Sequence, residues 1–158
     1  MSFSPAILIL PALAVLLLWA LRHALYRSLA PERIPERQTP GDVGLEFRTV
    51  QYATANHRQL FGWFIAAGRT SPAAAVALLH GWGGNAETLL PLAVPLHRAG
   101  FAVLLFDARC HGRSDEDSFA SLPRFAEDLE HALDWLKQQP EVDPTRLAAV
   151  GHSVGAGA

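Results

Sequence analysis

The first stretch of the chain is one block of apolar residues. From Pro5 to Leu21 it carries no charged side chain, and roughly 17 such residues are the short end of what a membrane-spanning helix requires. Trp19 and Tyr26 suit the interfacial end of such a helix, where amphipathic rings accumulate. We therefore expect residues 1–28 to be a transmembrane anchor.

A cleaved signal peptide and a buried soluble helix are the alternatives to an anchor. A signal peptide normally has a basic region before the apolar block and a small-residue cleavage site after it, and the sequence shows neither. The nearest basic residues all follow the block: Arg22, Arg27, Arg33 and Arg37. This bias predicts a single-pass membrane protein whose soluble domain lies on the cytoplasmic side.

After the apolar block the pattern changes twice. Residues 29–44 include PERIPERQTP, whose prolines and alternating charges predict a stiff spacer. From Leu45 apolar and polar residues alternate through residue 54, a polar break follows, and residues 60–67 (LFGWFIAA) resume the pattern. Alternation on both sides of a short break predicts a β-hairpin, which opens a catalytic domain over residues 45–158.

The rest of the chain alternates between short apolar runs and helical spacing. Helical spacing covers residues 87–99, closed by Gly100, and residues 122–139. Three continuous apolar runs predict strands buried on both faces: residues 73–80, 101–107 and 146–150. Strands separated by helices predict an α/β fold with a mostly parallel sheet and helices on both faces.

Composition narrows the possible partners. A net charge of −2 and a pI near 6.4 offer no concentrated basic surface, so we expect no nucleic acid partner. The single cysteine, Cys110, cannot form an internal disulfide and has no Cys/His cluster around it, so we expect no metal site. Oligomeric state cannot be deduced from these features.

The sharpest motif is G-x-S-x-G at residues 151–155, directly after an apolar run. In this context it predicts a strained strand-to-helix turn that exposes the hydroxyl of Ser153 as a catalytic nucleophile. Without the preceding strand the pattern would be an ordinary Gly-Ser turn. Dinucleotide binding is the weaker alternative, because the third glycine and the acidic residue of that motif are missing.

A second motif, HGWGG, follows the strand predicted at residues 73–80. A glycine-rich turn lets backbone N–H groups approach a developing oxyanion, so we predict an oxyanion hole formed by the amides of Trp82 and Val154. An ordinary tight turn is the alternative. The residues expected to support these two turns are His80, Gly81, Gly83, Gly84, Gly151 and Gly155.

The third motif, FDARCHGRS at residues 106–114, follows the strand predicted at residues 101–107. Asp107 and His111 could suggest a catalytic dyad or a metal site, but Asp, Arg and Ser in such a loop more often form a hydrogen-bonded brace. We therefore expect a brace. His152 adjoins the nucleophile in sequence and cannot face its hydroxyl as a base.

Together the three motifs resemble the amino-terminal half of the α/β-hydrolase superfamily over about residues 45–158. Cys110 departs from that pattern, since it stands where the family usually has glycine. The resemblance implies an acyl-enzyme mechanism on Ser153, no cofactor, and a small-molecule acyl substrate containing an ester, thioester or amide. The motifs are too widely shared to choose among esterases, thioesterases and peptidases.

In this family the triad acid and histidine follow the nucleophile, and the sequence ends five residues after Ser153. We therefore expect an incomplete fragment that is inactive on its own, with function assigned to the parent protein. A non-catalytic, membrane-tethered binding module is the main alternative function. An acyltransferase or a cofactor-free haloperoxidase on the same fold also stays open.

Overall fold

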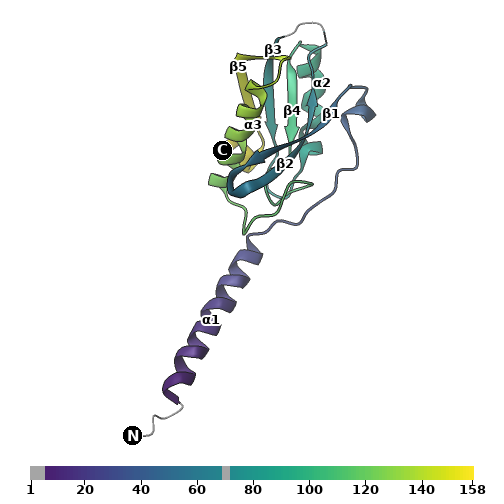
Figure 1. The fold of residues 1–158 in the computed structure, drawn as a ribbon. Coiled ribbons are helices and arrows are strands. Elements are labelled where there is room, and N and C mark those ends of the chain that lie inside the picture. Colours follow the sequence, from purple (N-terminus) through teal and green to yellow (C-terminus); the bar gives the residue numbers. More distant parts are fainter. Residues whose placement is uncertain (1–5, 69–71) are drawn as a thin grey trace.

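The computed structural model describes residues 6–68 and 72–158. A five-stranded sheet in the order β1-β2-β4-β3-β5 forms the centre of the domain, and a long helix projects from one end (Figure 1). The helices and strands, in chain order, are α1 (Ala6–Ser28), β1 (Arg48–Thr54), β2 (Arg58–Ile65), β3 (Ala73–Leu79), α2 (Leu90–Arg98), β4 (Ala102–Phe106), α3 (Leu122–Lys137) and β5 (Val142–Gly151).

The sheet is mixed, which corrects the prediction of a mostly parallel sheet. Strands β1 and β2 form the expected antiparallel hairpin, and β2 also runs antiparallel to β4. Only β4, β3 and β5 are parallel to one another. The connections account for part of this difference, because a tight turn joins the antiparallel strands β1 and β2, whereas α2 and α3 carry the chain back to start parallel strands.

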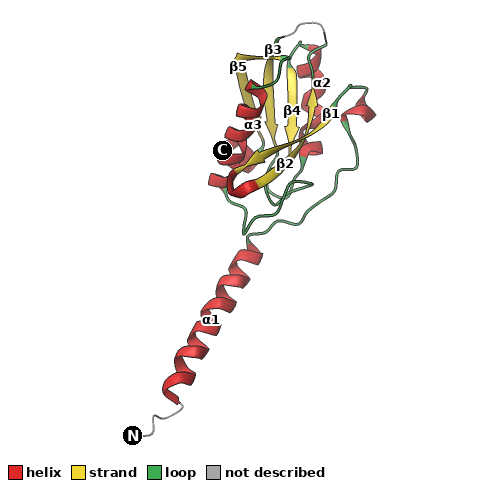
Figure 2. Ribbon diagram, in the orientation of Figure 1, coloured by secondary structure: helices red, strands yellow, loops and turns green. Residues whose placement is uncertain are grey.

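Helices cover both faces of the sheet, as expected (Figure 2). On one face Phe125, Ala132 and Leu136 of α3 pack with the strands, and on the other face Leu90 and Ala93 of α2 do so. Strand side chains alternate between the two clusters, as the two-residue period of a strand requires. The central strands β3 and β4 are buried on both faces.

Strand β5 differs from its prediction in exposure and in length. Residues 146–150 were expected to be buried, but most are exposed, and Val150 is 40% exposed. These residues are exposed because β5 lies at the edge of the sheet. Within the described residues, β5 pairs only with β3. Inside β5 the pairing with β3 is irregular, since it jumps from Ala73–Val142 to Ala75–Leu147.

The two N-terminal segments behave differently. Along α1 the side chains of residues 9–28 are exposed apart from the half-buried Tyr26. Residues 29–44, which we call the tether, were expected to be a spacer, yet they lie against the domain. The Leu29 carbonyl accepts a hydrogen bond from the Ala120 amide at 3.1 Å, and Pro40 is buried.

Candidate active site

Three loops meet at one edge of the sheet. In the parallel register Leu79 of β3 lies opposite both Phe106 of β4 and Gly151 of β5, so the three strands end at the same level. The loops that follow them carry the three motifs predicted from the sequence. In an α/β sheet the edge beyond the carboxyl ends of the strands is where ligands bind.

Ser153 stands on a sharp turn directly after β5. Its φ is +53°, a left-handed conformation that costs a non-glycine residue of the order of 1 kcal/mol, and the residue is exposed. The turn is fixed at both ends, because the His152 amide donates to the Leu79 carbonyl at 3.0 Å and the Gly155 amide donates to the His152 carbonyl at 2.9 Å. Residues Ser153–Gly157 form a 3₁₀ turn, where we had expected the start of an α-helix.

Several glycines of the two motifs lie where the backbone approaches closely. A Cβ on Gly151 would overlap the carbonyl of Gly155, and a Cβ on Gly155 would overlap the carbonyl oxygens of Leu79 and His80. A Cβ on Gly81 would lie 3.1 Å from the Cβ of Ser153. The HGWGG loop and the serine turn are therefore in direct contact.

His80 fixes the backbone of the HGWGG loop. Its ring is buried, and its Nε2 lies 3.0 Å from the amide of Ala108, which can only donate. The proton therefore sits on Nδ1, which donates to the Gly81 carbonyl at 2.7 Å. Burial lowers the pKa of His80 to about 3, so the ring is neutral and holds Gly81 in one orientation.

A surface depression of about 230 Å³ lies beside Ser153. Its lining contains Gly81, Trp82, Gly83, Gly84, Thr88, His152 and Ser153. The Trp82 side chain is 44% exposed and meets the His111 ring edge to face at 5.8 Å. The structure thus brings Ser153 and the HGWGG loop together. The side chain of Val154 is half-buried and packs against the core on the α3 face of the sheet.

The loop after β4 is a hydrogen-bonded brace, as expected. Asp107 accepts from the amides of Ala86 at 2.6 Å and Arg113 at 2.7 Å, which joins the loops after β3 and β4. Ser114 donates its hydroxyl to the Asp107 carbonyl at 2.6 Å and accepts from the amide of Phe61. These groups hold the loop in place.

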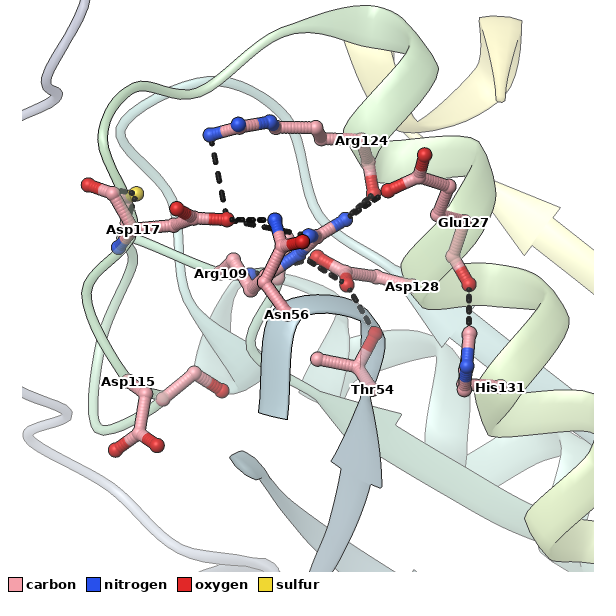
Figure 3. Close-up of polar contacts among 12 residues, drawn as sticks. Thr54, Asn56, Arg109, Asp115, Asp117, Arg124, Glu127, Asp128 and His131 are labelled. Atoms are coloured by element: carbon pink, nitrogen blue, oxygen red, sulfur yellow. Dashed lines mark hydrogen bonds and ion pairs between the residues drawn. The ribbon is translucent and has the colours of Figure 1, made fainter. Parts of the chain in front are cut away.

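Arg109 lies at the centre of a buried ion-pair cluster between this loop and α3 (Figure 3). Its Nε lies 2.7 Å from Asp128 Oδ1, with both side chains almost fully buried, and its Nη2 lies 2.6 Å from Glu127. Thr54 of β1 also donates to Asp128, at 2.7 Å. The cluster connects the loop, the helix and the hairpin.

Cys110 lies at a position whose backbone conformation favours glycine, the residue that the resembled family usually has there. Its φ is +67°, in the region where glycine has no steric penalty. The cysteine keeps this conformation, and its Sγ accepts from the Asp117 amide at 3.2 Å. Burial raises the pKa of the thiol, which disfavours the reactive thiolate.

Glu36 is a residue that the sequence pattern missed. It belongs to the tether, yet its Oε1 is buried without a hydrogen-bond partner among the described residues, and its carboxyl lies beside that of Asp107. Burial raises the pKa of Asp107 to about 8, and Glu36 adds to this against the opposing hydrogen bonds from the Arg113 and Ala86 amides. A glutamate in a proline-rich polar segment gives no sequence signal of burial.

The Glu36–Asp107 pair predicts a pH-dependent stability. Because the pKa of Asp107 is raised in the folded state, its contribution to stability is complete below the unfolded value of 3.8 and is lost as pH rises toward about 8. Glu36→Gln removes the neighbouring charge and supplies an amide donor. We expect the variant to unfold at a higher temperature than wild type near about pH 8, with a smaller difference near about pH 5.

Thermal unfolding of the complete protein at the two pH values would measure this effect. Glu32→Gln, at an exposed position of the same tether, is the matched control and should follow wild type. Parallel pH curves for Glu36→Gln and wild type would contradict the predicted coupling.

The Ser153 hydroxyl forms no hydrogen bond with any side chain in residues 6–68 and 72–158. His80 and His111 are buried and bonded to backbone carbonyls, those of Gly81 and Arg109. The same described residues contain no group of three or more His, Cys, Asp or Glu side chains that could hold a metal ion. The described site is therefore an exposed serine in contact with the glycine loop that follows β3.

Comparison with known proteins agrees with this arrangement. A model of the family described as serine aminopeptidase, S33, matches residues 70–158. The uncharacterized protein Rv2307c of Mycobacterium tuberculosis is 31% identical over 146 residues, which are 90% of this chain and 49% of that protein. The polyketide transferase ATR5 of Stachybotrys chlorohalonatus is 33% identical over 115 residues, covering 71% of this chain and 36% of that protein.

Among solved structures, the Pyrococcus furiosus esterase Pf2001 superposes with a TM-score of 0.72 at 30% identity. The match covers 80% of this chain and 47% of the esterase. The chain thus spans about half the length of the first relatives it matches, or less.

Proposed function

Because the chain belongs to the serine aminopeptidase S33 family of the α/β-hydrolase superfamily, we propose that the complete protein is a serine hydrolase with Ser153 as its nucleophile. Its substrate is a small molecule with a carboxylic ester, thioester or amide. One observation carries the proposal. Ser153 is exposed at φ +53° at the end of β5, in contact with the glycine loop after β3.

The chemistry proceeds through an acyl-enzyme. The Ser153 Oγ attacks the substrate carbonyl, and the amides of Trp82 and Val154 stabilise the negative charge on the carbonyl oxygen. The bond to the leaving group breaks as the serine proton passes to that group, and water then releases the acid. This route requires no cofactor. His80 supports it by holding the Gly81 carbonyl, which orients the peptide that contains the Trp82 amide.

The proton transfers require a base that faces Ser153. His80 and His111 are occupied by backbone bonds, and His152 adjoins the serine in the chain. We propose that a histidine oriented by an acid comes from another part of the complete protein, in the order that this superfamily uses.

Helix α1 is proposed to anchor the domain in a membrane. Within the 20 residues from Ile9 to Ser28, an 18-residue window has a mean hydropathy of 1.7, and none of its residues is buried, so no protein core covers it. A signal sequence passes the same test of length and composition. Arg22 and Arg27 at the end of the helix favour a domain on the cytoplasmic side.

Acyl transfer to an acceptor other than water is the second candidate function. The similarity to a protein named polyketide transferase favours it. Product analysis with and without an added alcohol acceptor separates the two activities, because only transfer yields a new ester.

Labelling with a fluorophosphonate tests the nucleophile directly. The complete wild-type protein is expected to react and Ser153→Ala is not, because the probe reports an activated serine hydroxyl. Ser118→Ala, which removes another exposed hydroxyl at the same end of the domain, is the control and should label like wild type. Equal labelling of wild type and Ser153→Ala would refute the proposed nucleophile.

A further inference from the structure

Helix α1 reaches the domain at the edge that carries Ser153. The Tyr26 ring stacks on Phe119 with centroids 5.4 Å apart, and the Leu29 carbonyl accepts from Ala120. Both partners belong to the loop that leaves the carboxyl end of β4. In Figure 1 the arrowheads of β3 and β4 point toward the end of the domain from which α1 leaves.

The tether continues past the candidate active site. Arg33 Nε donates to the Gly112 carbonyl at 3.0 Å, and Asn85 donates to the Ile34 carbonyl at 2.9 Å. Further along, the Arg37 amide donates to Glu87 at 2.6 Å. A cavity of about 300 Å³ lies between the tether and the loop after β3, and it shares Gly83, Gly84 and Thr88 with the depression at Ser153.

These contacts fix the orientation of the site relative to the anchor. A free spacer would let the domain turn any face toward the bilayer. A tether bonded to the loops after both β3 and β4 instead holds the Ser153 edge toward the end of α1. The opposite edge, where β3 and β5 begin, faces away from the anchor.

Apolar side chains are exposed at this same edge. Trp82 and Leu122 are each 44% exposed, and Leu29 and Ile34 of the tether are also exposed. Leu122 borders the serine turn, since a Cβ on Gly157 would lie 3.3 Å from its side chain. Exposed apolar groups next to a nucleophile and an anchor suit contact with acyl chains.

We propose that the substrate is an ester lipid of the membrane that holds α1, presented to Ser153 from the bilayer surface. This inference rests on the proposed function. The Ser153 Oγ bonds to the acyl carbon, the bond from that carbon to the glycerol oxygen breaks, and the serine proton passes to that oxygen. Water then hydrolyses the acyl-serine to a fatty acid.

The test uses the complete protein in vesicles of a diether phospholipid, which contains no carboxylic ester. Oleoylglycerol in the bilayer and p-nitrophenyl acetate in solution are the two substrates. Leu122→Asp places a charge on the apolar rim and is expected to lower the ratio of oleoylglycerol hydrolysis to p-nitrophenyl acetate hydrolysis at least about tenfold. Leu92→Asp is the matched control, because Leu92 is 42% exposed on α2, on the opposite face of the sheet from α3.

A second variant tests orientation without changing the rim. A flexible 20-residue Gly/Ser insertion after Ser28 is expected to lower the rate on oleoylglycerol at least about tenfold, since the effective concentration of the lipid falls. Hydrolysis of the soluble ester alone, or lipid hydrolysis that neither variant changes, would overturn the lipid proposal and leave the serine hydrolase intact. Absence of both hydrolysis and fluorophosphonate labelling would instead refute the proposed function.

Discussion

Replacing Ser153 by alanine is expected to lower kcat of the complete protein by about 10⁶-fold, the size of the loss seen when the serine nucleophile of a triad is removed. The reason is that the acyl-enzyme route is lost, whereas the glycine loop that binds the carbonyl stays in place. Initial rates on p-nitrophenyl acetate measure the loss, with Ser118→Ala as the control. A variant that keeps more than about a tenth of the activity would contradict the mechanism.

Ser153→Gly separates the chemical role of the residue from its conformational strain. Both Ser153→Gly and Ser153→Ala lack the hydroxyl, but only glycine adopts φ +53° without a steric penalty. We expect the glycine variant to be inactive and more stable than the alanine variant by about 1 kcal/mol. Urea unfolding would measure the difference, and equal or reversed stabilities would show that the turn is unstrained.

Replacing Asp128 by alanine is expected to destabilise the domain by about 3–5 kcal/mol. The Asp128 carboxylate accepts from the Arg109 amide at 2.8 Å, from Arg109 Nε at 2.7 Å and from Thr54 Oγ1 at 2.7 Å. Its removal leaves the buried guanidinium with two weaker partners, Asp117 at 3.3 Å and the half-exposed Glu127. A buried charge that loses its buried partner costs more than the lost bonds alone.

Chemical denaturation of the complete protein would measure this loss, and the same helix provides the control. Asp134 also lies on α3, but it is exposed and pairs with Lys137 on the surface. Asp134→Ala is expected to leave the unfolding midpoint nearly unchanged, because exposed pairs add little to stability. Similar midpoints for the two variants would show that the buried cluster contributes no more than a surface pair.

Much of the fold was predictable because each motif directly follows an apolar run. The continuous runs at residues 73–80 and 101–107 are strands buried on both faces, and the loops after them lie at one edge as expected. The apolar run at residues 146–150 does not by itself give the number of partner strands, and the exposure of β5 follows from its having one partner, β3, among the described residues. Strand partners are a long-range property that local periodicity does not contain.

The sequence predicted the glycine turns of the candidate site, but it did not predict that the tether packs beside the site. Two glycine positions in the sequence, Gly151 and Gly155, mark places where the structure leaves no room for a Cβ, and Gly81 marks a place where a Cβ would be in tight contact. The tether is the opposite case. Its prolines and charges predict a spacer, yet Arg33 and Glu36 find partners more than 70 residues away in sequence, in the loop after β4.

The docked tether also decides where a soluble version of this protein should start. The pattern of the sequence suggests beginning at Leu45, after the prolines. Such a protein would lack the Arg33 side chain bonded to Gly112 and the Glu36 carboxyl beside Asp107, and would uncover the loops that flank the nucleophile. Cutting between Ser28 and Pro31 keeps these contacts and removes only the apolar helix, so expression and crystallisation trials should begin there.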